Sequence, residues 1–136
     1  MGFLKPVGQQ HVEVEDGQHN TLRVDKDVAL MREHFKLEHI DYRYMSPVII
    51  PSGYTKRYVD GEITLQGQKD DVETAMEHIA SNSDVTLIEG TGHCAVGSIV
   101  GLNNARVASL LGADMVLVYV YWVWFRRLCI SAGNVR

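Results

Sequence analysis

The sequence has few cysteines, no excess of basic residues and no long apolar run. Its two cysteines, Cys94 and Cys129, lie far apart in 136 residues and lack the spacing of metal ligands. This pattern excludes a disulfide framework and a zinc site, and it favours a reducing compartment. Lysine and arginine number 13 against 17 aspartate and glutamate, a formal net charge of −4. Such a balance gives no electrostatic basis for binding nucleic acid or an anionic membrane.

Signals for membrane insertion or export are also missing from the sequence. The stretch Met1–Lys5 is too short for a signal peptide, and Pro6 follows it at once. The apolar run from Met115 to Phe125 is about half as long as a bilayer-spanning helix, and two arginines follow it. We therefore expect no membrane segment and a cytoplasmic protein, with an organellar location left open because the true N-terminus is not certain.

The length indicates one domain or part of one. Apolar spacing and turn residues divide it into alternating elements. The expected strands are 2–7, 85–88 and 115–118, and the expected helices run from Asp25 to about Leu37, over 66–80 and over 105–111. This order, with two wholly apolar strands, predicts an α/β fold with a parallel sheet.

Two long segments give no regular pattern in this interpretation. The polar stretch 8–20 predicts a loop. Residues 42–58 contain Pro47, Pro51 and Gly53 and predict an irregular excursion.

One carboxylate stands where an apolar strand enters a glycine-rich turn, in the segment Asp84-Val-Thr-Leu-Ile-Glu89-Gly-Thr-Gly92. Ligands of open α/β sheets bind beyond the carboxyl ends of the strands, so Glu89 is expected to face a ligand crevice. Gly90 and Gly92 would let the backbone approach a phosphate or turn sharply. The alternative is an ordinary turn with a solvated glutamate.

Three short segments carry a resemblance to a known family: Gly2-Phe-Leu-Lys5-Pro6-Val-Gly, Val24-Asp-Lys-Asp27-Val-Ala-Leu and Ile88-Glu89-Gly-Thr-Gly. In this order they resemble the dethiobiotin-synthetase-like branch of P-loop NTPases, which includes AAA-type ATP-binding modules found alone or ahead of phosphotransacetylases. The run 96–105, the helix after it and the apolar stretch beyond Leu111-Gly-Ala-Asp are similar to the AAA-type members. The resemblance covers about residues 2–118.

The resemblance implies a role for each of these residues. Lys5 would be a catalytic, charge-stabilising group near the phosphates of ATP, and Asp27 and Glu89 would hold Mg²⁺. The turn Gly90, Thr91 and Gly92 would bind the nucleotide cofactor. The alternatives are a solvated lysine at a strand end for Lys5 and, for Asp27, an acid in the first turn of a helix, where the dipole favours it.

The sequence departs from the family because it contains no Gly-x-x-x-x-Gly-Lys-Ser/Thr. We therefore expect a partial Rossmann-like, three-layer P-loop NTPase fold over 1–118 that lacks the first strand, the P-loop and the first helix. ATP binding is expected to be weak or absent without that loop. Residues 119–136 form a divergent aromatic tail that extends a strand, pairs with a partner or reflects an altered reading of the gene, the last being favoured.

Three functional hypotheses follow. The first is a fragment of a Mg²⁺-dependent ATP-binding domain of an ATP-dependent ligase or NTPase, not competent alone, with a nucleotide and a small acid as its ligands. The second is a regulatory or ligand-sensing module that pairs with a full-length relative or with itself through an exposed sheet edge. The third is a non-functional fragment.

Other candidate residues carry weaker signals. His93 and Cys94 are a possible catalytic pair, but adjacent residues in extended chain point apart. The remaining histidines lack metal-ligand spacing and are expected at the surface. A basic and aromatic patch binds a carboxylate or phosphate in one interpretation and is a solvated loop in the other. It comprises Tyr44, Tyr54, Lys56, Arg57 and Tyr58.

Overall fold

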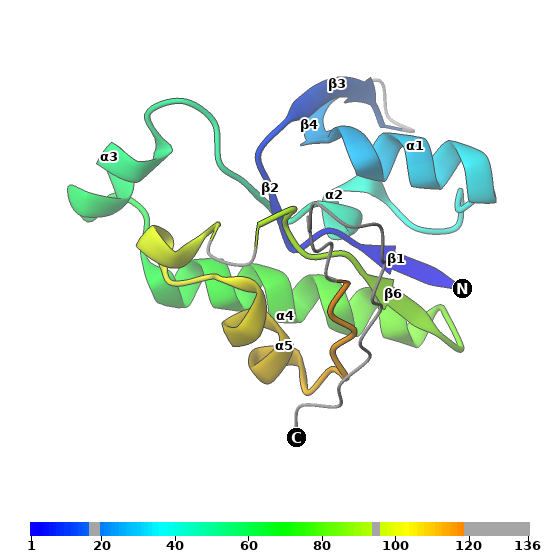
Figure 1. Cartoon of the computed structure of the whole chain (residues 1–136). Helices are drawn as coiled ribbons and strands as arrows, with labels where there is room; N and C mark the ends of the chain where they lie inside the picture. The colour runs from blue at the N-terminus through cyan, green and yellow to red at the C-terminus, as the bar shows by residue number, and fades with distance from the viewer. Residues whose placement is uncertain (17–19, 94–95, 119–136) are drawn as a thin grey trace, which may run out of the picture.

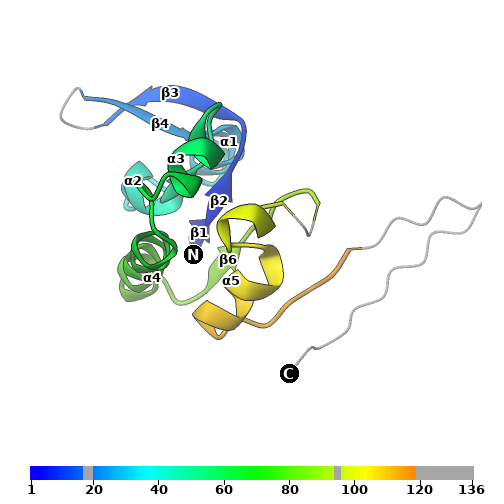
Figure 2. The same ribbon diagram turned by 90° about the vertical axis from the view of Figure 1, so that its left-hand side faces the viewer.

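A pair of short parallel strands, β1 (Gly2–Leu4) and β6 (Thr86–Ile88), lies at the centre of the molecule with helices on both sides (Figures 1 and 2). The computed structural model describes residues 1–16, 20–93 and 96–118. The expected α/β fold with parallel strands is confirmed, although each sheet formed by the described residues has two strands. The expected tail, 119–136, lies outside the described residues.

Among the described residues, four strands come first, and helices then predominate, interrupted by β5 and β6. The other strands are β2 (Val7–Gly8), β3 (His11–Glu15), β4 (Thr21–Asp25) and β5 (Val48–Ile49). The helices are α1 (Lys26–Phe35), α2 (Tyr42–Met45), α3 (Tyr54–Val59), α4 (Leu65–Ser81), the 3₁₀ turn η1 (Ser98–Val100) and α5 (Asn104–Leu111). The three long helices expected from the apolar spacing are therefore confirmed.

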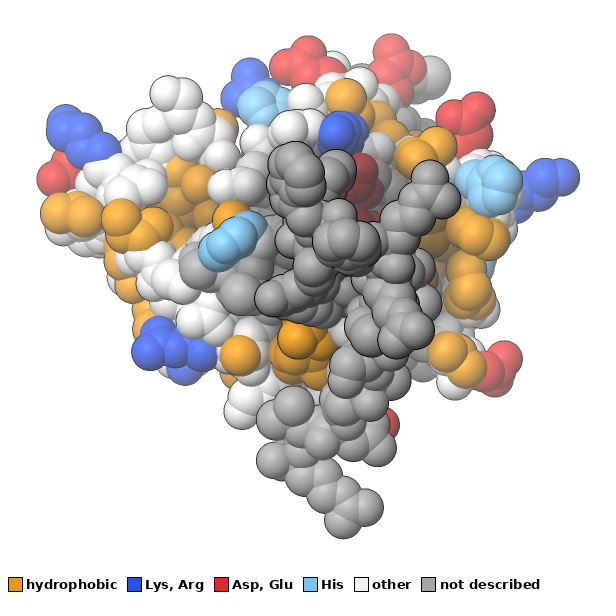
Figure 3. Space-filling model, viewed as in Figure 1, with side chains coloured by type: hydrophobic (Ala, Val, Ile, Leu, Met, Phe, Trp, Pro, Cys, Tyr) orange, Lys and Arg blue, Asp and Glu red, His pale blue; other side chains and the backbone are white. Residues whose placement is uncertain are grey.

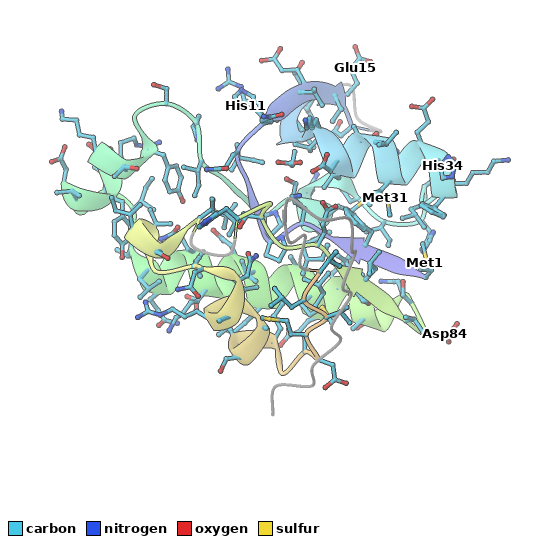
Figure 4. All side chains as sticks on the ribbon, in the orientation of Figure 1. Met1, His11, Glu15, Met31, His34 and Asp84 are labelled. Carbon is cyan, nitrogen blue, oxygen red and sulfur yellow. The ribbon has the colours of Figure 1, made fainter. Side chains whose placement is uncertain are left out.

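The register of β1 and β6 decides what meets at their carboxyl ends. Phe3 pairs with Leu87, and Leu4 pairs with Ile88. The ladder continues one step further, where the Glu89 N–H donates to the Leu4 carbonyl at 2.9 Å. Met1 and Asp84 mark the amino ends of β1 and β6, and both lie at the right of Figure 4. Parallel pairing in this register therefore places Lys5 beside Glu89.

Two hydrophobic clusters support this strand pair, and α4 contributes to both. Phe3 and Leu4 are fully buried in the first cluster, together with Ile79 of α4. Val72 of α4 packs in the second cluster with Val7 and with residues of η1 and α5. The apolar stripe of α4 thus fixes the strand that carries Lys5 against the elements that follow β6.

The first expected strand, 2–7, is interrupted near its carboxyl end, at Lys5 and Pro6. The chain forms β1 up to Leu4, leaves the ladder at Lys5 and Pro6, and forms β2 at Val7. Proline has no N–H to donate to a ladder, so a strand pair cannot continue unbroken through Pro6. The break frees the Lys5 side chain from the regular alternation of the sheet.

The expectation of a loop over 8–20 was wrong, because β3 and β4 form an antiparallel hairpin. Val12 pairs with Val24, and Val14 pairs with Leu22. The segments His11–Glu15 and Thr21–Asp25 each alternate apolar and polar residues, which is the pattern of a half-buried strand. The alternation was present in the sequence, but its high polarity hid it.

Two further expectations need correction. Residues 42–58 contain α2, β5 and α3, since Asp41 caps α2 and β5 pairs with β2. Within the described part of the chain, residues 115–118 form no strand. A strand requires a neighbour, and there the exposed fractions of Val116, Leu117 and Val118 are 75%, 54% and 72%.

Candidate functional site

Lys5 lies at the carboxyl end of β1 and is the centre of the candidate site. Its residue surface is 5% exposed. Its backbone N–H donates to the Met45 carbonyl of α2 at 2.8 Å, which anchors the chain just where β1 ends. The Lys5 side chain therefore projects from a fixed backbone position.

Asp27 reaches the same place from the first turn of α1. Asp25 is the N-cap of this helix, and its Oδ1 accepts from the Asp27 N–H at 3.0 Å. The second oxygen of Asp25, Oδ2, accepts from the Gln9 N–H at 3.2 Å. One buried carboxylate thus joins the start of α1 to the segment after β2.

The three side chains named as catalytic and metal-binding in the sequence come together. Lys5 Nζ lies 2.8 Å from Asp27 Oδ2 and 2.9 Å from Glu89 Oε1, although 22 and 84 residues separate the partners in sequence. The side chains of Asp27 and Glu89 are 33% and 42% exposed. The alternative of a solvated Lys5 was therefore wrong. Lys5 is buried and forms ion pairs with two carboxylates, whose side chains are partly exposed to solvent.

The electrostatics of this double ion pair favour the charged forms of Lys5 and Asp27. Burial on its own would lower the pKa of Lys5, but hydrogen bonds to Asp27 and Glu89 outweigh it, and the pKa lies above the usual 10.5. The hydrogen bond from Lys5 lowers the pKa of Asp27 below the usual 3.8, against the opposing effect of burial. The cluster carries a net charge of −1 and therefore attracts a further cation.

A polar cavity of about 240 Å³ opens beside this cluster. Lys5, Asp27, Thr91 and Gly92 line it, so it brings the strand end, the helix start and the glycine turn to one surface. Five lining residues were not singled out for the site from the sequence: Val7, Gln9, Gln10, Asp25 and Lys26. They join the site because the segment at and after β2 lies beside the start of α1, where the Lys26 N–H donates to the Gln10 carbonyl at 2.8 Å.

The glycine turn after Glu89 is held by the start of α5. The Thr91 N–H donates to Asn104 Oδ1 at 3.0 Å, and the Asn104 Nδ2 donates to the Thr91 carbonyl at 3.1 Å. Gly90 and Gly92 have φ angles outside the left-handed region, so neither needs to be glycine for that reason. At Gly90 a Cβ atom would lie 2.7 Å from Asn104 Nδ2, so a side chain there would displace the Asn104 amide.

A larger cavity of about 530 Å³ adjoins the first across Thr91. Apolar residues of β6, α5 and 113–117 form most of its wall, including Ile88, Val107 and Leu117. Val85, just before β6, and Leu87, within it, are 67% and 50% exposed. Among the described residues β6 pairs with β1 alone, so its other edge is open.

The basic and aromatic patch does not join the site. Its cations pair locally, Arg57 with Glu62 at 3.0 Å and Lys56 with Asp60 at 3.7 Å. Helix α3, which carries both cations, lies at the far left of Figure 1, away from β1. Tyr44 instead stacks on His78 with ring centroids 3.8 Å apart. The patch is therefore not one surface.

Histidine and cysteine chemistry finds no further support. His78 is half-buried in its stack on Tyr44 rather than at the surface. Cys94 lies outside the described residues, so the pairing of His93 with Cys94 stays a prediction. In the ranges that the structure describes, no three His, Cys, Asp or Glu side chains form a group able to hold a metal on their own.

Surface charge and helix length are the structural features that concern nucleic-acid and membrane binding. On the face drawn in Figure 3, basic and acidic side chains of the described residues are interspersed around the outline instead of forming one basic area. None of the helices in the described residues has both the length and the apolar character to cross a bilayer.

The α/β fold with parallel strands is that of a partial, Rossmann-like P-loop NTPase. A family described as an AAA domain matches residues 1–121. The chain belongs to this family of P-loop NTPase-like modules. Comparisons with curated proteins and with solved structures give no match.

Proposed function

We propose that residues 1–118 are the part of a Mg²⁺-dependent ATP-binding domain that carries the phosphate-binding lysine and the metal-binding carboxylates. This domain would resemble dethiobiotin synthetase-like ligases and NTPases. The observation that carries the proposal is the convergence of Asp27 and Glu89 on Lys5, with Nζ–O distances of 2.8 and 2.9 Å, beside a polar cavity that Lys5 and Asp27 line. An ion pair that served stability alone would have no need of a cavity at its open side.

The donor set fits magnesium. Mg²⁺ prefers hard oxygen ligands and usually takes one or two carboxylates, with waters and phosphate oxygens completing its coordination. Asp27 and Glu89 supply two partly exposed carboxylates of that kind. A bound Mg²⁺ would neutralise phosphate charge, which is the main requirement of phosphoryl transfer. Lys5 and Lys26 would hold phosphate oxygens at the cavity, and Thr91 and Gly92 would form its wall.

These 136 residues contain no glycine-rich phosphate loop. The phosphate contacts available within them are the ammonium groups and the turn after Glu89, which favours weak nucleotide binding over turnover. We assign no acid substrate, because the basic and aromatic patch that would hold it lies away from the cluster.

Calorimetric titration with ATP tests the proposal. We expect saturable heat that requires Mg²⁺, and an affinity lowered about tenfold or more in Glu89→Gln and Asp27→Asn, since each removes one anionic ligand. Glu77→Gln, at an exposed position of α4, is the matched control and should bind as wild type. Heat that is absent, or that survives both site variants, would contradict a metal-nucleotide site here.

A second candidate is an interaction module that associates through the open edge of β6. The exposed Val85 and Leu87 favour it, together with the edge of β6 that is unpaired among the described residues, because an unpaired apolar strand edge is a template for pairing. Sedimentation velocity should then show concentration-dependent association that Leu87→Lys abolishes. Leu30→Lys, at a 63% exposed position of α1, should leave association unchanged. A monomer at every concentration would reject this candidate.

A further inference from the structure

Asn104 makes an unusually complete contact with Thr91. Its Oδ1 accepts from the Thr91 N–H at 3.0 Å and from the Thr91 hydroxyl at 2.9 Å, and its Nδ2 donates to the Thr91 carbonyl at 3.1 Å. The side-chain amide therefore satisfies both backbone groups of Thr91, as a neighbouring strand would. This contact joins two segments that are 13 residues apart in sequence.

The same amide also lies against Gly90. A Cβ atom at Gly90 would be 2.7 Å from Asn104 Nδ2 and 2.8 Å from its Cγ. The amide thus packs on both residues that directly follow Glu89. On the other side, the Glu89 N–H is held by the Leu4 carbonyl at 2.9 Å. The backbone around Glu89 is consequently fixed from β1 and from α5.

Helix initiation does not account for Asn104. The N-cap of α5 is Asn103, whose Oδ1 accepts from the Arg106 N–H at 3.0 Å. Asn104 is the first residue within the helix, a position that alanine or aspartate occupies without cost. Its amide is therefore free to serve the turn after β6, while its neighbour starts the helix.

We infer that Asn104 is a positioning residue that holds the Glu89–Thr91 backbone so that the Glu89 carboxylate stays at Lys5, which lines the cavity. The Glu89 side chain is 42% exposed, so its direction depends on the backbone that carries it. This inference rests on the proposed function for its consequence, the affinity for Mg²⁺, but its structural content is independent of nucleotide.

The test compares Asn104→Asp, Asn104→Ala and Asn103→Ala. Aspartate keeps the shape and suits the first turn of a helix, but it cannot donate to the Thr91 carbonyl, so it changes the turn without removing the helix. Asn103→Ala is the matched control, because it weakens the helix start and leaves the contact with Thr91 in place.

Two measurements separate the inference from the proposed function. Hydrogen exchange of the Thr91 amide, measured without nucleotide, should be faster in Asn104→Ala than in wild type after correction for global stability, and unchanged in Asn103→Ala. In calorimetry with ATP, the Mg²⁺ concentration at half-saturation should rise about tenfold in Asn104→Asp, the usual scale for losing a partner that orients a metal ligand. Asn103→Ala should match wild type.

Each outcome decides the inference. If the Thr91 amide exchanges faster in Asn104→Ala, Asn104 is supported as the residue that holds the turn. If, in addition, the wild-type protein gives no heat with Mg²⁺-ATP, the proposed function is rejected while this structural role stands. Unchanged exchange, or a Mg²⁺ requirement that shifts equally in the Asn103 and Asn104 variants, overturns the inference, because both results describe a residue that acts through helix stability alone.

Discussion

Lys5→Met is expected to lower the free energy of unfolding by about 2–3 kcal/mol. Methionine fills the channel of the lysine stem but leaves Asp27 and Glu89 facing each other without the cation that lies 2.8 and 2.9 Å from them. Removing one partner of a buried ion pair costs about 3–5 kcal/mol, and the partial exposure of both carboxylates reduces this value. Urea unfolding with an unchanged m value would measure the effect.

Two control variants test whether the loss of stability in Lys5→Met comes from charge. Lys56→Met removes an exposed cation 3.7 Å from Asp60 and should cost about 0.5 kcal/mol or less. Adding Asp27→Asn and Glu89→Gln to Lys5→Met should recover part of the lost stability, since the unpaired carboxylates are then neutral. If the triple variant is no more stable than Lys5→Met, the loss comes from packing and not from charge.

Lys5→Met should also change how the free energy of unfolding depends on pH. The pKa of Asp27 is lowered in the folded protein, so its contribution is present above the usual 3.8 and is lost as the pH falls below it. The pKa of Lys5 is raised, so its contribution is complete below the usual 10.5 and is lost as the pH rises above it. Lys5→Met should therefore flatten the stability profile on both its acid and its alkaline side. A profile parallel to wild type would contradict the charged cluster.

Asp25→Ala is expected to cost about 2–3 kcal/mol and to displace Asp27 as well. Asp25 is 3% exposed, and its two oxygens accept from the N–H groups of Asp27 and Gln9 at 3.0 and 3.2 Å. Loss of an N-cap costs about 1 kcal/mol, and loss of the second hydrogen bond, from the Gln9 N–H to a charged oxygen, adds about 1.5 kcal/mol. Urea unfolding measures the first effect, and calorimetry with Mg²⁺-ATP measures the second.

Asp41→Ala is the matched control for Asp25. Asp41 caps α2 through a bond from the Arg43 N–H at 3.0 Å, and its other oxygen pairs with Arg43 Nε at 3.1 Å. Both contacts stay within one segment, so the loss of Asp41 should cost about 1 kcal/mol. Asp25→Asn should lie between wild type and Asp25→Ala, because an amide offers one oxygen to two N–H donors. Equal losses in Asp25→Ala and Asp41→Ala would show that the link to Gln9 carries no stability.

Local sequence signals predicted the elements that carry the site. The apolar spacing of α4, the capping aspartate before α1 and the apolar strand before Glu89 each depend on neighbours within a few residues, and each is confirmed. The hairpin β3–β4 also has a local signal, the alternation of Val12 and Val14, which the surrounding polar residues obscured.

The wrong expectations concern contacts with distant partners. Residues 115–118 are as apolar as a buried strand, but in the described chain no neighbour pairs with them. The short strand β5 is the opposite case, since two residues become a strand because β2 lies beside them. Strand formation is shared between two segments, so the composition of one segment does not decide it.

The sequence by itself determined the family, the α/β class and the residue types of the site, because Lys5, Asp27 and Glu89 each stand in a recognisable local setting. Only the tertiary structure decided that they meet. The parallel register of β1 and β6 sets Lys5 beside Glu89, and Asn104 holds the turn that follows. Both are contacts over long separations in sequence, whose geometry is fixed by hydrogen bonding and core packing between whole elements and leaves no periodic trace along the chain.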